Sequence, residues 1–290
     1  RLASATEFNR IWKAGLERVG IGEDSPGLNG EADGTGWATS TEPKNEADMI
    51  ALAKKLNPVV GFWDPLQIVT SETRPETIGW FRQAEIKHGR VAMAGFVGYL
   101  VQANGIYFPW DIQKAVPGTS ITDSLPTISF ADISAAGGPA DQWDALPTAA
   151  KAQILFVVGF LEMWSENSVI LEADGNKHYV RGGKPGVFPS FKNRLPHPVP
   201  LDLFDPFGFT NKLTPEQKEK KLLAEVNNGR LAMIGMFGVI CASKGLIVPG
   251  LDTLGIKPYA GEIMAPFTAA DASLPFVAEM AKNIGTYGWN

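Results

Sequence analysis

Two stretches of the chain repeat one set of side chains that could ligate a metal and balance charge. Each has a carboxylate first, a second donor three residues later and an arginine five residues later: Glu85, His88 and Arg90, then Glu225, Asn228 and Arg230. Side chains three residues apart lie on one face of a helix, one turn on. Carboxylate oxygen is a donor that Mg²⁺ prefers. The pattern therefore predicts two helices that present magnesium ligands beside an arginine.

These stretches belong to a longer internal repeat. Residues 85–98, EIKHGRVAMAGFVG, return 140 residues later as residues 225–238, EVNNGRLAMIGMFG, with seven of the fourteen positions identical. The shared order of an Asp-Pro turn, polar first turns, Gly-Arg and an apolar run makes chance a poor explanation, so we expect two equivalent helices. The Asp-Pro pairs, about 20 residues before each copy, are Asp64-Pro65 and Asp205-Pro206.

Three long helices are expected to position these side chains. A proline in the first turn predicts helices over residues 75–103 and 215–244, with Thr214 as the N-cap of the second helix and Gly245 as its stop. A third helix is expected over residues 146–167. At about 1.5 Å per residue, helices of 25–30 residues are long enough to cross a bilayer.

Shorter elements are expected around these helices. Two amphipathic stretches, residues 46–56 and 274–284, are expected to lie flat or to pack on the surface. Residues 104–145 and 168–213 are rich in glycine and proline and are expected to form long loops. Loops of this length are unusual in a compact soluble domain and indicate binding or interfacial segments.

The charges in the repeated helices predict how these helices meet. Glu85 and Arg90 are five residues apart, about 140° around a helix, so they cannot pair well with each other. An ionised Glu or Arg at the centre of a membrane helix costs roughly 2.5–3.5 kcal/mol. If the copies cross about a local two-fold axis, Glu85 can pair with Arg230 while Glu225 pairs with Arg90. The glycines that would let the backbones approach are Gly89, Gly95, Gly98, Gly229, Gly235 and Gly238.

Bulk composition argues against several classes of protein. The net charge of −5 gives no reason to expect nucleic acid binding, and the single cysteine, Cys241, excludes an intrachain disulfide. No nucleophile–base set, phosphate loop or His/Cys metal cluster indicates an enzyme. Mean hydropathy is −0.03, so hydropathy alone indicates a soluble protein. A soluble helical scaffold or enzyme is therefore the alternative, and detergent-free solubility would favour it.

The connections between the predicted helices differ in charge. Residues 103–150 contain one basic residue, Lys114, and five aspartates, whereas residues 168–224 contain nine basic residues. This asymmetry fits three membrane crossings with the basic connection on the non-translocated side; a basic soluble loop is the other interpretation. The nine are Lys177, Arg181, Lys184, Lys192, Arg194, Lys212, Lys218, Lys220 and Lys221.

The repeated motif, with its Asp-Pro leaders, resembles the chlorophyll-binding motif of the light-harvesting complex superfamily over residues 61–244. The resemblance implies an all-α membrane protein with three transmembrane helices, the first and third crossed with pseudo-two-fold symmetry, plus short amphipathic helices and long loops. It implies an antenna protein and no enzyme. The implied axial ligands of chlorophyll magnesium are Glu85, His88, Gln153, Glu162, Glu225 and Asn228, with Arg90 and Arg230 as ion-pair partners, and Asp64, Pro65, Asp205 and Pro206 beside carotenoid end rings.

Some positions depart from the pattern of this superfamily. Many members have a glutamine 17 residues after the third-helix glutamate, where this chain has Ala242, so that site lacks its usual donor. A C-terminal histidine ligand is absent as well. His178 and His197 lie in the basic connection, where each could ligate a peripheral pigment or be a solvated loop histidine.

Residues 101–110, 178–186 and 197–200 resemble chlorophyll a/c antennae of algae with red-type plastids. They are similar to dinoflagellate peridinin–chlorophyll a/c membrane antennae first and to diatom fucoxanthin antennae second. The implied cofactors are chlorophyll a, chlorophyll c and carotenoids (peridinin or fucoxanthin, and diadinoxanthin). The implied partners are photosystem core subunits, of photosystem I by preference, neighbouring antenna proteins and thylakoid lipids.

The resemblance also implies a location and an organisation of the chain. The location is the chloroplast thylakoid membrane, with several crossings. Residues 1–59 would be a stromal or interfacial segment, residues 60–245 the chlorophyll-binding domain, and residues 246–290 a lumenal extension with an amphipathic helix. The chain begins at Arg1 without an apolar targeting segment, so we expect a mature form. The function would be transfer of excitation energy to a photosystem; a relative that dissipates energy as heat is the alternative.

Overall fold

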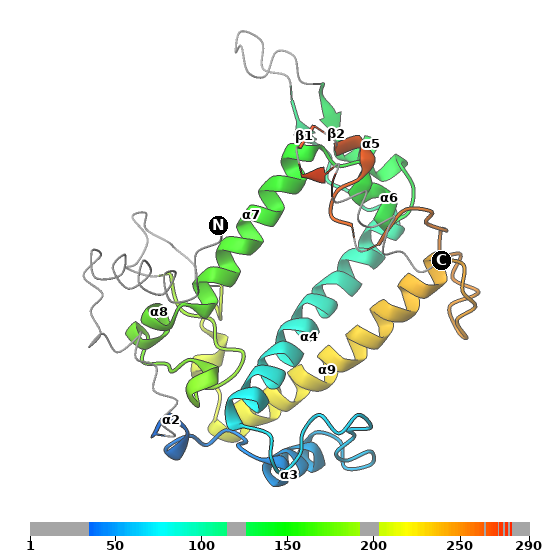
Figure 1. The fold of residues 1–290 in the computed structure, drawn as a ribbon. Coiled ribbons are helices and arrows are strands. Elements are labelled where there is room, and N and C mark those ends of the chain that lie inside the picture. The colour runs from blue at the N-terminus through cyan, green and yellow to red at the C-terminus, as the bar shows by residue number, and fades with distance from the viewer. Residues whose placement is uncertain are drawn as a thin grey trace, which may run out of the picture. The chain divides into compact units, whose positions relative to one another are not determined.

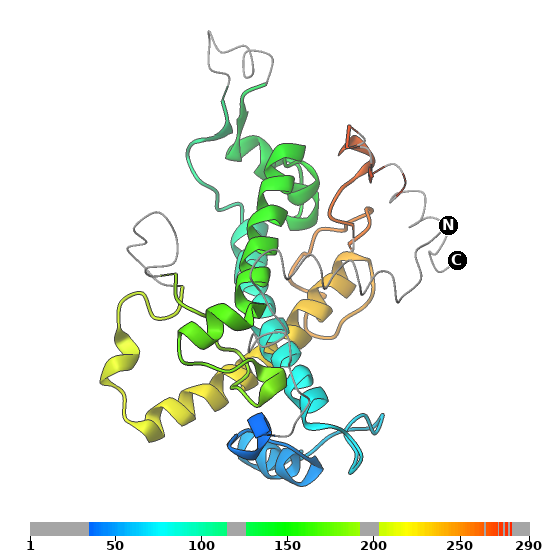
Figure 2. The ribbon, with the colours of Figure 1, turned by 60° about the vertical axis from the view of Figure 1, so that its left-hand side comes forward.

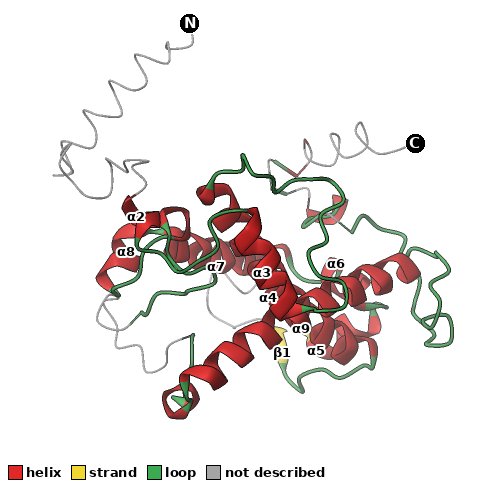
Figure 3. Ribbon diagram, turned by 90° about the horizontal axis from the view of Figure 1, so that it is seen from below, coloured by secondary structure: helices red, strands yellow, loops and turns green. Residues whose placement is uncertain are grey.

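The computed structural model describes residues 35–114, 126–191, 203–263, 265–271, 273, 274, 276, 277 and 279. These residues are mostly helical (Figures 1 and 3). The three long helices are α4 (Pro75–Ala103), α7 (Thr148–Glu166) and α9 (Pro215–Ser243). The shorter α-helices are α2 (Thr35–Ala38), α3 (Glu46–Leu56), α5 (Phe130–Ala135), α6 (Pro139–Asp144) and α8 (Ser168–Ala173), with 3₁₀ turns at Tyr179–Arg181, Phe209–Lys212 and Ala269–Asp271.

The long helices begin and end close to the predicted residues, for the predicted reasons. At the start of α9, the Gln217 backbone N–H donates to the Thr214 hydroxyl over 3.3 Å, and the Gln217 side chain accepts from the Thr214 N–H over 3.1 Å. This reciprocal cap satisfies two N–H groups that the helix leaves open. Gly245, with φ of 83°, follows its last turn. Helix α3 matches its predicted bounds, whereas residues 280–284 of the second amphipathic stretch lie outside the described residues.

The connection between α4 and α7 corrects two predictions. It contains the helices α5 and α6 where a long loop was predicted, and a two-stranded antiparallel sheet where an all-α fold was predicted. The strands, yellow in Figure 3, are β1 (Asp111–Gln113) and β2 (Ile128–Ser129), and Asp111 pairs with Ser129. The glycine and proline content of this connection predicted a loop. A local capping box formed by Ser129 and Asp132 nevertheless starts the short helix α5.

The chain divides by its contacts into two compact units, and the first comprises residues 1–84 and 163–218. Its described part is held together around the buried Trp37, whose indole N–H donates to the Val180 carbonyl over 3.0 Å. The Gln83 side chain accepts from the Gly186 N–H over 2.6 Å. These bonds fix the first turns of α4 against the 179–186 segment.

The second unit comprises residues 85–162 and 219–290. Residues 85–103 of α4 and 219–243 of α9 lie side by side and cross (Figures 1 and 2). The start of α7 packs on the C-terminal segment through an ion pair between Lys151 and Asp271, 2.7 Å long, with both side chains at most 3% exposed. The Tyr259 hydroxyl adds a 2.8 Å bond to Asp144.

The middle of α7 is exposed on every side. Residues 153–160 are all exposed, and eight consecutive residues cover more than two turns and thus every face of a helix. They are almost all apolar; Phe156 is 76% exposed. By length and apolar character together, no helix in the described part of the chain qualifies as a membrane span. The three predicted crossings stay a prediction.

Candidate functional site

Two glycines form the point where α4 and α9 cross. A Cβ atom added at Gly89 would lie 3.0 Å from the Gly229 Cα, and one added at Gly229 would lie 2.9 Å from the Gly89 Cα. Real Cβ atoms rarely or never approach backbone so closely, so any larger residue at either position would force the two backbones apart. The two contacts are nearly equal, as expected for equivalent positions related by a local two-fold axis.

Reciprocal ion pairs flank this crossing, as the spacing of the repeat predicts. The Arg230 Nε donates to Glu85 Oε1 over 2.7 Å, and the Arg90 Nε donates to Glu225 Oε1 over 2.6 Å. All four side chains are partly buried, between 28% and 40% exposed. Each carboxylate has a second oxygen, so a guanidinium on one side does not prevent a metal bond on the other.

The second donor of each motif lies on the surface. His88 and Asn228 are both exposed, one turn after Glu85 and Glu225 respectively. Exposed apolar side chains lie close to them in the chain, Val91 on α4 and Leu231 on α9. Each is therefore accessible to a ligand that approaches α4 or α9 from outside.

Helix α7 contributes the other two predicted ligands. Gln153 is exposed and lines a cavity of about 470 Å³, together with Ile154 and Val157 of the same helix and Ile112 of β1. Glu162 pairs with Lys87 of α4, whose Nζ lies 2.6 Å from Glu162 Oε2. Lys87 was not among the predicted site residues.

The two Asp-Pro segments belong to the other compact unit and form related turns. Asp64 accepts the Val69 N–H over 2.8 Å, and Asp205 accepts the N–H groups of Phe209 and Thr210 over 2.7 and 2.8 Å. Backbone bonds, from Val69 first, lower the pKa of Asp64. The Thr210 hydroxyl bond is the main cause of the lowered pKa of Asp205. Both carboxylates thus close turns, while Pro65 and Pro206 are exposed beside them.

His178 is engaged within the protein at both ring nitrogens. Its Nε2 lies 3.2 Å from Glu166 Oε2, and its Nδ1 accepts the Val180 N–H over 3.3 Å. This arrangement favours a structural role for His178 over pigment ligation. His197 lies outside the described residues.

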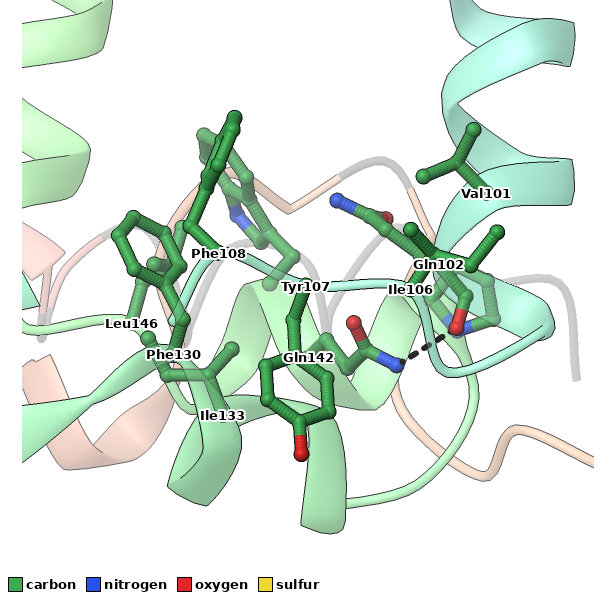
Figure 4. Close-up of a pocket in the computed structure, with 11 residues that line it drawn as sticks. Val101, Gln102, Ile106, Tyr107, Phe108, Phe130, Ile133, Gln142 and Leu146 are labelled. Carbon is green, nitrogen blue, oxygen red and sulfur yellow. Dashed lines mark hydrogen bonds between the residues drawn. The ribbon is translucent and has the colours of Figure 1, made fainter. Parts of the chain in front are cut away.

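An apolar pocket of about 410 Å³ lies at the C-terminal end of α4, against α5 and α6 (Figure 4). The buried Gln142 holds one wall, because its amide nitrogen donates to the carbonyls of Gln102 and Gly137, each over 3.2 Å. The volume lies within the range of about 300–1,000 Å³ for small-molecule sites. The apolar wall residues are Val101, Ile106, Phe108, Phe130, Ile133 and Leu146.

Comparison with known protein families agrees with this geometry. Residues 50–244 match the family described as Chlorophyll A-B binding protein, a range that includes α4, α7 and α9. The chain belongs to the chlorophyll a-b binding family. The mostly helical fold is consistent with this family, and the antenna character of the family agrees with the prediction that the chain is no enzyme.

Three proteins from Phaeodactylum tricornutum, Trieres chinensis and Macrocystis pyrifera are similar to this chain. Fucoxanthin-chlorophyll a-c binding protein F of Phaeodactylum tricornutum is 35% identical over 188 residues, 64% of this chain and 76% of that protein. Fucoxanthin-chlorophyll a-c binding protein of Trieres chinensis is 35% identical over 184 residues, 63% and 73% of the two chains. Protein F of Macrocystis pyrifera is 29% identical over 220 residues, 74% and 86%. The predicted red-lineage resemblance is thereby confirmed.

Proposed function

We propose that this chain is a light-harvesting antenna protein that binds chlorophyll a, chlorophyll c and fucoxanthin and passes excitation energy to a photosystem. The observation that carries the proposal is the pair of reciprocal ion pairs at the crossing of α4 and α9. Glu85 and Glu225 each meet an arginine through Oε1 at 2.6–2.7 Å. The pairing neutralises the carboxylates in apolar surroundings and fixes their direction, as an axial magnesium ligand requires.

The proposed ligands suit a magnesium ion that the chlorophyll macrocycle already holds. The proposed ligands are single oxygen or nitrogen donors spread along the three long helices, and a chlorophyll magnesium needs one axial donor from the protein. Bound chlorophyll would supply light absorption and excitation transfer. The residues of the chain would set the separation and orientation of the pigments. The proposed ligands are Glu85, His88, Gln153, Glu162, Glu225 and Asn228.

The exposed middle of α7 supports the proposal that lipid and pigment cover this part of the helix. A helix that is apolar on every face is stable where apolar material surrounds it, and residues 153–160 are exposed to their surroundings in the protein alone. Gln153 lies within this stretch and lines a cavity of about 470 Å³. A pigment in that cavity would cover apolar surface and meet the Gln153 amide.

Similarity to fucoxanthin-chlorophyll a-c binding proteins favours fucoxanthin over peridinin as the main carotenoid. We propose that end rings of carotenoids lie beside the turns closed by Asp64 and Asp205, next to Pro65 and Pro206. These turns expose apolar side chains, among them Trp63 and Phe207. The apolar pocket beside Gln142 is a further site of suitable size for part of a carotenoid.

We further propose that α4, α7 and α9 each cross the thylakoid membrane. The connection before α7 is acidic and the connection after it is basic. This difference in charge supports a position on opposite sides of the membrane for the two connections. Residues 246–290 would then be lumenal and residues 1–59 stromal or interfacial. The partners would be photosystem core subunits and neighbouring antenna proteins, with photosystem I preferred. Co-migration with photosystem I in mildly solubilised membranes would support this preference, and co-migration with photosystem II alone would contradict it.

The test is reconstitution of the full chain in detergent with chlorophyll a, chlorophyll c and fucoxanthin, followed by pigment chromatography and an absorption spectrum. We expect the wild-type chain to retain all three pigments. Arg230→Leu leaves Glu85 without its cation, so we expect loss of pigment or of assembly. Arg74→Leu is the matched control, because Arg74 is exposed at the start of α4 and lies outside the crossing. A wild-type chain that takes up no pigment would overturn the proposed function.

A further inference from the structure

A lysine of α4 reaches the carboxylate that α7 presents. Lys87 Nζ lies 2.6 Å from Glu162 Oε2, with side chains 27% and 57% exposed respectively. The lysine side chain is therefore partly covered by protein, while the glutamate side chain faces outward. A cation held in this way can contact an outward-facing carboxylate without blocking access to it.

Lys87 and Glu85 point to different sides of α4. Two residues correspond to about 200° around a helix, and the Glu85 side is occupied by its pair with Arg230 of α9. Lys87 therefore faces away from the crossing, toward α7. Helix α4 thus forms an ion pair with each of the other two long helices.

The three carboxylates proposed as chlorophyll ligands share one arrangement. Each has an oxygen close to a cation that belongs to a different helix. The distances are 2.7 Å from Arg230 to Glu85, 2.6 Å from Arg90 to Glu225 and 2.6 Å from Lys87 to Glu162. The crossing pairs come from the repeat, whereas the Lys87 pair lies outside its symmetry, because the residue equivalent to Lys87 is Asn227.

The surroundings of Glu162 make its counter-ion important. Glu162 lies two residues after the apolar stretch of α7, residues 153–160, that is exposed on every face. An ionised carboxylate in apolar surroundings is unstable unless it is paired. Without Lys87, Glu162 would lose the 2.6 Å contact that balances its charge and fixes the direction of its carboxylate.

We infer that Lys87 is the positioning residue of a chlorophyll site on α7: it pairs with the Glu162 carboxylate and directs that carboxylate toward the magnesium. The inference rests on the proposed function, since Glu162 is the ligand through which Lys87 acts. A lysine ammonium is a compact point charge, and here it contacts one oxygen of the carboxylate, Glu162 Oε2. A carboxylate has two oxygens, so this contact is compatible with an axial bond to magnesium.

The test reconstitutes the full chain with chlorophyll a, chlorophyll c and fucoxanthin and counts pigments per chain. We expect Lys87→Met to lose about one chlorophyll, because loss of a residue that orients a metal ligand weakens the metal site. Glu162→Leu should lose the same chlorophyll, recognised by the same change in the visible circular dichroism spectrum. Lys87→Arg keeps the charge and should retain the pigment.

A rescue experiment separates charge balance from simple helix packing. In Lys87→Met with Glu162→Gln, the ligand is a neutral amide that needs no cation, so we expect the chlorophyll to return. Failure of this double variant to regain it, or a Lys87→Met chain with the full pigment count, would overturn the inference. In either case pigment binding by the wild-type chain would leave the proposed function standing, whereas an unpigmented wild-type chain would remove both.

Discussion

At the residue scale, the closest approach of α4 and α9 and their ion pairs depend on each other. Gly89 and Gly229 meet backbone to backbone, and Arg90 and Arg230 follow them directly in the chain. A side chain at the crossing would push the helices apart. The ion pairs, now 2.6 and 2.7 Å long, would lengthen with the same movement, and a charge-assisted bond weakens steeply with distance.

We expect Gly89→Ala to destabilise the protein. The new methyl group would lie 3.0 Å from the Gly229 Cα, and backbone cannot rotate away as a side chain can. Overpacking of this kind costs roughly 1–3 kcal/mol. The measurement is the temperature at which pigment-loaded protein in detergent loses its visible circular dichroism, which should fall.

Gly98→Ala is the matched control, because a Cβ atom at Gly98 of the same helix meets nothing within 4 Å. It should leave the midpoint unchanged or raise it, since alanine favours a helix over glycine by up to about 1 kcal/mol. Equal midpoints for Gly89→Ala and the wild-type chain would mean that the close approach is dispensable.

Residue contacts could be predicted only where the repeat encodes them. Glu85 and Arg90 lie about 140° apart on their helix, so helix geometry alone predicts that each pairs with a residue of the other copy. The Lys87 contact with Glu162 joins a repeated helix to α7, which has no copy in the chain. Nothing in the spacing of the repeat indicates it. A need for a counter-ion beside Glu162 was the one available signal.

At the scale of elements, the C-terminal segment is clamped to the start of α7 by a buried polar cluster. Asp271 accepts from Lys151 over 2.7 Å, from the Thr148 hydroxyl over 2.5 Å and from the Thr268 N–H over 2.9 Å. Burial alone would raise the pKa of Asp271, but the bonds from Lys151, Thr148 and Thr268 outweigh it and lower the pKa to about 2. The sequence analysis missed this cluster, because its halves lie 120 residues apart in the chain.

This clamp should survive acidification. A carboxyl group whose folded pKa is lowered contributes stability above its ordinary pKa of 3.8 and loses it as the pH falls toward about 2. Between pH 7 and pH 5 we therefore expect unchanged hydrogen-exchange protection of residues 259–271, after correction for intrinsic rates. Lys151→Met leaves a buried charge unpaired, which costs roughly 3–5 kcal/mol, and should remove that protection at both pH values. Loss of protection at pH 5 in the wild-type chain would contradict this account.

The elements themselves were predictable to different degrees. Helices α4 and α9 have strong local signals, a proline in the first turn and a glycine after the last, and their bounds agree with the prediction to within a residue. The connection before α7 has no long segment that lies between such a start signal and such a stop signal. Its helix α6 begins at Gly138 and Pro139, residues that in isolation indicate a loop.

At the scale of the whole molecule, near-neutral hydropathy and apolar outward faces are compatible. At the crossing, the charges of Glu85 and Arg90 on α4 pair with those of Arg230 and Glu225 on α9, so the cost of these four charges in apolar surroundings is largely cancelled. Exposed apolar side chains remain on the same helices, among them Val91, Ile234 and Phe237. A hydropathy average counts these paired charges in full, so a near-neutral average is compatible with the three crossings that we propose.

The proposed crossings predict opposite sides for the two connections that flank α7. Lys114 and Lys184 are both exposed, one in the acidic connection and one in the basic connection. In a chain whose Cys241 is replaced by serine, single variants Lys114→Cys and Lys184→Cys supply matched labelling sites. An impermeant maleimide added outside sealed, oriented thylakoid vesicles should label one variant, and detergent should be required to label the other. Three crossings place the basic connection on the stromal face, so Lys184→Cys is the variant that should react in vesicles with that face outward. Equal labelling of both variants without detergent would mean that α7 does not cross the membrane.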